Sequence, residues 1–79
     1  MVKKLKRLAT SIAWAHYEYP RTFHTDFFDG DITIYHSKSK EFSFTINLND
    51  GKSIDSACNI IQCWCNGIFK PVEELKYGC

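Results

Sequence analysis

The chain has 79 residues, of which 44% are apolar and 15% aromatic, and it contains only two Pro and four Gly. A chain of this length has room for one domain with a single small core, and this composition is too apolar for a disordered protein. The formal net charge of +1 gives no overall case for nucleic-acid binding. We expect residues 1–79 to form a single compact α+β domain that is a monomer or a small homo-oligomer.

Charge is distributed unevenly along the chain. Residues 1–25 contain five Lys and Arg against one Glu, a net charge of +4, whereas residues 26–79 contain five Lys against eight acids, a net charge of −3. The basic start precedes a run over residues 8–15 that resembles a secretory signal, but Thr10 and Ser11 interrupt that run. No stretch approaches the ~20 apolar residues of a membrane span. We therefore expect a cytoplasmic protein that does not bind a membrane.

The first predicted element is a helix over residues 3–17. Six residues in this segment recur at intervals of three and four, which is the helical period, and form one apolar stripe along the helix. They are Leu5, Leu8, Ala9, Ile12, Ala15 and His16. Pro20 ends the helix, because the residue before a proline is pushed out of helical geometry. One alternative stays open, in which residues 11–19 form a strand.

Three strands are predicted next. Residues 22–28 are rich in aromatic and β-branched side chains, and Asp29-Gly30 is a type I′ turn signal that returns the chain through residues 32–36. After a polar turn over residues 37–40, apolar residues alternate with polar ones, as in a half-buried strand; the apolar ones are Phe42, Phe44, Ile46 and Leu48. These strands predict a three-stranded antiparallel meander.

A second helix is expected to begin with Ser53 as its N-cap and to end with Gly67 in a left-handed C-cap. Steps of 100° per residue place an apolar group on one face, namely Ile54, Ala57, Cys58, Ile61, Trp64, Cys65 and Ile68. A short helix is predicted from Pro71 through Leu75. The fold class is therefore α+β, in the order α-β-β-β-α, with the meander packed by helices on one face.

The four cysteines divide by their place on the second helix. Cys58 and Cys65 lie on its apolar face and are expected in the core. Cys63 points about 160° away from Cys65, so we predict an exposed Cys63 that either pairs with Cys79 or lies in an interface. In the native protein we expect Cys63 and Cys79 to be the reactive thiols. The cysteine spacing differs from that of zinc ribbons, and we predict no metal and no cofactor.

The histidines give no catalytic signature. His24 and His36 fall on neighbouring strands of the predicted hairpin, on one sheet face with Asp26 nearby, and such a cluster would titrate near neutral pH. No Ser or Cys is placed beside them as a nucleophile. We therefore predict that the protein is not an enzyme.

Trp14 is the strongest candidate for a binding residue. On a helix it lies opposite the apolar stripe and in line with Lys3 and Arg7, and Trp and Arg are enriched in hot spots of protein interfaces. If residues 11–19 form a strand, or the helix is covered on both sides, Trp14 belongs to the core. We predict a small non-enzymatic protein-binding or inhibitory module whose size suggests a phage or mobile-element accessory protein that blocks a host factor. Its predicted binding residues are Trp14, Arg7, Lys3, Thr10 and Cys63.

The order of the elements is similar to that of the double-stranded-RNA-binding domain. At the start of its last helix that family has a Ser-Lys-Lys-x-Ala-Lys run whose lysines contact phosphates; here Ser53 and Ala57 match, while Ile54, Asp55 and Cys58 replace the lysines. This resemblance and the basic first helix support an alternative prediction. In it, the chain is a nucleic-acid-binding domain that neutralises phosphates with cationic side chains. Those side chains are Lys3, Lys4, Lys6, Arg7 and Arg21.

Overall fold

The elements of the chain follow the predicted order, and helices cover one face of the sheet. The structure is a computed structural model that describes residues 1–37 and 42–79. Its elements are α1 (Val2–Glu18), β1 (Phe23–Phe28), β2 (Asp31–His36), β3 (Phe42–Asn47), α2 (Gly51–Cys65) and α3 (Val72–Leu75). The strands form one antiparallel sheet in the order β1-β2-β3, which confirms the predicted fold class. The predicted polar turn over residues 37–40 falls mostly outside the described residues.

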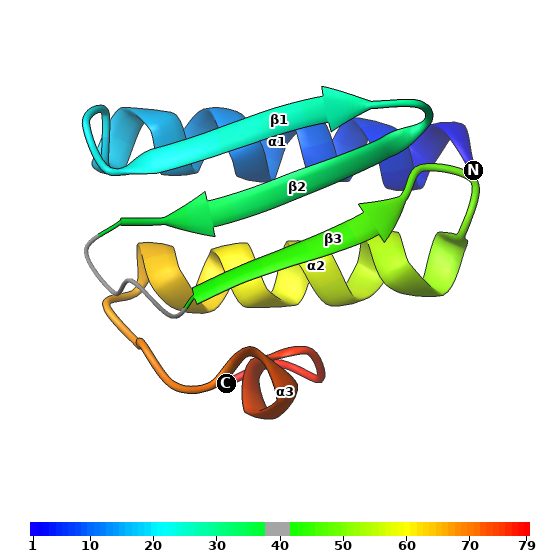
Figure 1. The fold of residues 1–79 in the computed structure, drawn as a ribbon. Coiled ribbons are helices and arrows are strands. Elements are labelled where there is room, and N and C mark those ends of the chain that lie inside the picture. The colour runs from blue at the N-terminus through cyan, green and yellow to red at the C-terminus, as the bar shows by residue number, and fades with distance from the viewer. Residues whose placement is uncertain (38–41) are drawn as a thin grey trace.

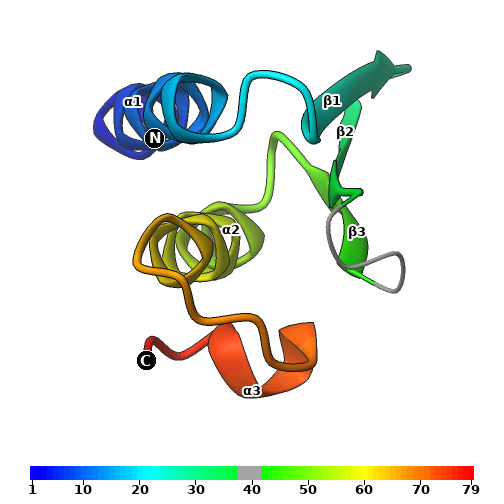
Figure 2. The same cartoon turned by 90° about the vertical axis from the view of Figure 1, so that its left-hand side faces the viewer.

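The two long helices form a layer behind the sheet. They lie side by side and run in the same direction (Figure 1). Viewed along that layer, α1 lies beside β1, while α2 lies toward β3 and is followed by α3 (Figure 2). The outer face of the sheet carries no helix in either view.

α1 is a single helix through Glu18, so the strand alternative for residues 11–19 is wrong. Leu8 and Ala15 are buried and Ile12 packs against the core, which is the helical spacing rather than the alternation of a strand. The helix ends before Pro20, where the backbone N–H of Tyr19 donates to the carbonyl of Ala15 at 2.8 Å. The helical spacing of the apolar residues therefore predicted the helix correctly.

The β1–β2 turn has the predicted type. Asp29 and Gly30 have φ values of 52° and 82°, and the type I′ turn requires positive φ at both positions. The resulting register pairs His24 with Tyr35 and Phe23 with His36. His36 is therefore buried, whereas His24 is exposed on the other face. The predicted shared face for the two histidines is wrong, because the turn fixes a register in which they alternate.

α2 begins two residues earlier than its predicted N-cap. Asp50, in extended geometry after β3, caps the helix by accepting from the backbone N–H of Lys52 at 3.1 Å. The hydroxyl of Ser53, the predicted cap, instead donates to Asp50 Oδ2 at 2.7 Å. At the other end Gly67 has φ of 80° and closes a Schellman motif with the bonds Gly67 N–H to Trp64 O and Ile68 N–H to Cys63 O. The predicted C-cap is confirmed.

The cap makes part of the folding stability dependent on pH. The hydrogen bond from Ser53 lowers the pKa of Asp50 from its ordinary value of 3.8. A carboxyl whose pKa is lowered by folding adds stability above its unfolded pKa, and this stability is lost as the pH falls through the folded pKa. Asn also caps helices but does not titrate. We expect Asp50→Asn to fold with little change at neutral pH and to lose less stability than the natural chain on acidification, measured by urea unfolding along a pH series. If both chains lost the same free energy of unfolding as the pH falls, this role for Asp50 would be contradicted.

Trp64 is the centre of the core. Its side chain is 0% exposed, and five rings lie 5.8–6.4 Å from its centroid, those of Phe23, His36, Phe42, Phe44 and Phe69. The Tyr19 hydroxyl donates to the Trp64 carbonyl at 2.6 Å. This aromatic cluster joins the end of α1, the sheet and α2 at one end of the molecule.

Candidate functional site

A straight line of side chains follows the outer side of α1. The residues are spaced by four, three, four and three positions, which keeps them on one helix face, and all are exposed: Lys3, Arg7, Thr10, Trp14 and Tyr17. We refer to these five as the α1 stripe. Trp14 is 38% exposed and Tyr17 is 82% exposed. Two aromatic rings, one of them partly covered, therefore share one helix face with two cations.

One end of the stripe is held in place by α2. Arg7 Nη2 donates to Asn59 Oδ1 at 3.3 Å, and Arg7 Nη1 lies 3.9 Å from Asp55 Oδ1. Lys4 Nζ lies 2.7 Å from the other oxygen of the same carboxylate. These side chains are 42–48% exposed, so the ion pairs are partly screened. Their consequence is geometric, because they direct the Arg7 guanidinium toward α2.

The remaining predicted residues divide between the stripe and other surfaces. The Thr10 hydroxyl donates to its own helix, to the Lys6 carbonyl at 3.0 Å. Lys6 points about 100° away from Arg7 around the axis, and Arg21 lies in the turn between α1 and β1. Of the five cations predicted for nucleic acid, Lys4 and Arg7 pair with Asp55. Thus the structure gathers Lys3, Arg7, Thr10 and Trp14 but not the whole cationic set.

Sequence reasoning missed Tyr17 as a member of this surface. It was the last residue of the predicted helix, and its spacing of three from Trp14 is the signal that identifies it. Helical ends are hard to place from sequence. Because α1 continues to Glu18, Tyr17 lies on the helix and extends the stripe by one turn.

The prediction of an exposed Cys63 is wrong. Cys63 is 0% exposed and forms a disulfide with Cys79, with a Cα–Cα distance of 5.9 Å. The chain after α3 returns along this side of α2 and covers it, which helical periodicity alone does not reveal. The pairing alternative is confirmed, and Cys63 lies apart from the α1 stripe, which is on the other helix. Cys63 therefore belongs to no surface site.

The disulfide also reverses the expected thiol reactivity. Cys63 and Cys79 have no free thiol, and the unpaired cysteines are the buried Cys58 and the half-buried Cys65. Burial raises the pKa of the Cys58 thiol and raises that of Cys65 to about 11. Because the thiolate is the reactive form, both react slowly at neutral pH.

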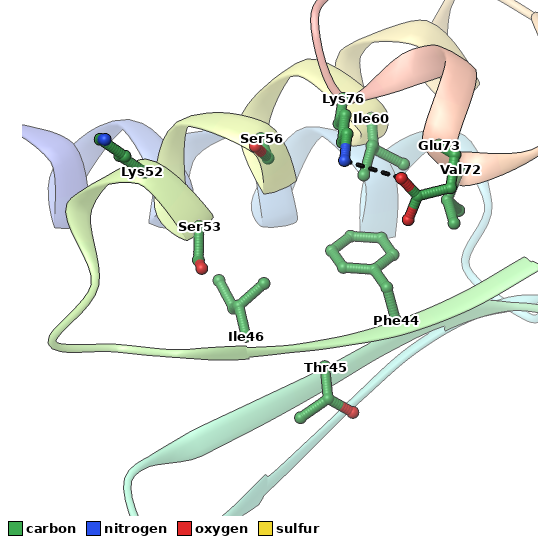
Figure 3. Close-up of a pocket in the computed structure, with 10 residues that line it drawn as sticks. All are labelled: Phe44, Thr45, Ile46, Lys52, Ser53, Ser56, Ile60, Val72, Glu73 and Lys76. Carbon is green, nitrogen blue, oxygen red and sulfur yellow. Dashed lines mark ion pairs between the residues drawn. The ribbon is translucent and has the colours of Figure 1, made fainter.

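A shallow groove lies between β3, α2 and α3 (Figure 3). Its volume is about 280 Å³ and its apolar lining includes Phe44, Ile46 and Ile60. At its rim Lys76 Nζ pairs with Glu73 Oε2 at 2.7 Å. Neither histidine nor cysteine is among the described residues that line it. The groove thus offers surface for contact, and the one lining hydroxyl described above, that of Ser53, takes part in the cap of α2.

The chain matches no family model, and it is similar to no curated protein and to no solved structure at a significant level. Over residues 1–37 and 42–79, no helix has the length and apolar content needed to cross a membrane. Within the same ranges, His, Cys, Asp and Glu side chains form no group of three that could hold a metal ion.

Proposed function

We propose that the protein is a small non-enzymatic module that binds another protein through the α1 stripe. The observation that carries this proposal is the partly exposed Trp14 in line with an oriented Arg7 on one rigid helix face. Trp, Tyr and Arg are the side chains most enriched in interface hot spots. All three types occur in the stripe, at Trp14, Tyr17 and Arg7.

Rigidity supports this assignment. α1 packs along α2, and the hydrogen bond from Arg7 to Asn59 limits the freedom of the cation in the free protein. Side chains that are already ordered lose less conformational entropy on binding. A helix face whose aromatic and cationic groups repeat along its length fits a partner that contacts several turns at once.

The experiment that tests the function is affinity capture from the native host followed by measured binding of the captured protein. We expect Trp14→Ala to weaken binding about 30-fold or more, which corresponds to about 2 kcal/mol or more for a hot spot. Tyr77→Ala is the matched control, because Tyr77 is another exposed aromatic at 84% exposure but lies outside the stripe. If both variants lost affinity equally, or if Trp14→Ala lost none, the α1 stripe would not be the binding interface.

A nucleic-acid partner is the alternative outcome of the same experiment. The stripe could stack a base on Trp14 while Lys3 and Arg7 contact phosphates. Such binding weakens steeply with salt, because counterions are released when phosphates are neutralised. Binding to generic duplex and single-stranded nucleic acid that falls steeply along a salt series would favour the alternative.

Inhibition of a host factor stays a prediction within this proposal. A bound partner loses access to whatever surface the stripe covers, so blocking requires no chemistry by this chain. The expected phage or mobile-element source follows from size alone.

A further inference from the structure

The outer edge of β1 is an open edge of the sheet. Within the described ranges, no strand pairs with β1 on the side away from β2. Figure 2 shows β1 at the end of the sheet nearest α1, with α2 and α3 toward the opposite end. Unpaired edges with apolar side chains are surfaces on which other strands add, and Phe27 and Phe28 are 69% and 82% exposed.

The backbone groups that face this open edge can be identified. Bonds from Ser37 N–H to Thr22 O and from Leu48 N–H to Gly30 O set the alternation of both ladders. The same alternation turns the backbone N–H and C=O of Phe23, Thr25 and Phe27 away from β2. The Phe23 N–H is already bonded to the Tyr19 carbonyl at 3.1 Å. Thr25 and Phe27 therefore present donors and acceptors at the edge, and Phe23 presents an acceptor.

We propose that a second copy of this chain pairs with β1 in antiparallel orientation, with a two-fold axis at Thr25, and that the two sheets become one. In this register Thr25 pairs with its own counterpart, and Phe27 lies opposite Phe23 of the second copy. Each pair brings together residues whose backbone groups face the edge. Main-chain bonds across the axis then pair the Thr25 donors and acceptors and bond the Phe27 N–H to the Phe23 carbonyl, while the Phe23 N–H keeps its bond to Tyr19.

Two exposed polar side chains of β1 favour this register over its neighbours. His24 and Asp26 are exposed on the outer face, and the His24 ring stacks on Tyr35 with centroids 5.2 Å apart. With the axis at Thr25, His24 of each copy lies opposite Asp26 of the other, so that imidazole N–H groups face carboxylates. Moving the axis to His24 or to Asp26 breaks both of these pairs. With the axis at Asp26, two carboxylates also lie directly opposite each other, and like charges in that position destabilise a sheet.

The same axis covers an apolar region on the helix side. A hollow of about 180 Å³ between α1 and the hairpin is lined by Leu5, Ala9 and Phe27 among others. Leu5 is 38% exposed. Since α1 is the helix that lies beside β1 (Figure 2), the axis brings α1 toward its counterpart. Apolar surface of both α1 and β1 is thereby removed from water, which stabilises the dimer.

The test is sedimentation velocity of the full chain over a concentration series reaching the millimolar range. We expect a reversible dimer. Thr25→Pro removes an edge-facing donor but no bond of the β1–β2 ladder, the position at which strands tolerate proline. It should raise the dissociation constant about tenfold or more. Thr45→Pro, at the corresponding place on the opposite edge of the sheet, is the matched control and should leave the dimer unchanged.

A charge exchange tests the register with exposed side chains. Asp26→Lys replaces the carboxylate that accepts from His24 of the second copy with a side chain that has no acceptor, and it should weaken the dimer about tenfold. The double variant His24→Asp with Asp26→Lys places a carboxylate opposite a cation and should recover the natural affinity. Circular dichroism verifies that each variant is folded. If Thr25→Pro unfolds, the variants at His24 and Asp26 test the dimer without it. A monomer throughout the series, equal weakening by both prolines, or no response to Asp26→Lys overturns the proposal.

Discussion

Replacing Trp64 with alanine is expected to destabilise the fold by about 3–5 kcal/mol, the range for large aromatic residues deleted from a core. Five neighbouring rings pack around Trp64, and a cavity there would border α2 and the sheet together. A domain of this size is stable by roughly 0.05–0.15 kcal/mol per residue, or about 4–12 kcal/mol, so the variant should lose from about a quarter to all of its stability. Urea unfolding followed by circular dichroism measures the loss.

Trp14→Ala is the control for this result. Its partly exposed side chain packs less extensively, so the substitution should cost well under half as much free energy of unfolding. The chain contains two Trp residues, so the control variant also leaves Trp64 as the single tryptophan whose fluorescence reports unfolding. If Trp14→Ala were as destabilising as Trp64→Ala, Trp14 would belong to the core and not to an interface.

Reducing the disulfide between Cys63 and Cys79 is expected to lower the free energy of unfolding by about 3 kcal/mol. The bond joins residues 16 positions apart. Closing a loop of about 15 residues lowers the conformational entropy of the unfolded chain, which stabilises the folded state by about 3 kcal/mol. The segment it ties back contains Leu75, which is 1% exposed in the core. Reduction should therefore loosen α3 and the covering of α2 first. Urea unfolding with and without dithiothreitol measures the difference.

Cys79→Ser separates the disulfide from other effects of reductant. The variant should be about as stable as the reduced natural chain, and dithiothreitol should not change it further. A reductant effect of equal size in the variant would place the cause elsewhere. Because glutathione and thioredoxin reduce disulfides in the cytosol, the stabilisation applies to the protein in oxidising surroundings.

Local patterns predicted the elements of the fold because each pattern has a local cause. The alternation of β3, the two positive-φ residues between β1 and β2, and the glycine after α2 act within a few residues of chain. Two errors have different causes. Asp50 became the α2 cap because the turn after β3 leaves it extended, which is a local effect. Cys63 became buried because a distant segment, the chain that returns from α3, covers it. Neither fact is contained in the helical period.

In the candidate site, too, features with a local cause were predicted and contacts between distant segments were not. Periodicity placed Lys3, Arg7, Thr10 and Trp14 on one line. It gave no indication that Arg7 is fixed by Asn59 and Asp55, since those side chains lie on another helix. The open edge of β1, by contrast, follows from the predicted meander, in which the first and third strands have no outer neighbour.

The contacts of α1 with α2 join parts of the chain that are far apart. Lys4 and Asp55 are 51 positions apart, Arg7 and Asn59 are 52 apart, and Tyr19 and Trp64 are 45 apart. Contacts of such separation carry a larger loop-closure entropy than the hairpin contacts of the meander. α1 thus lacks its main partner, α2, until residues 51–65 have been made, and it is poorly suited to nucleate folding.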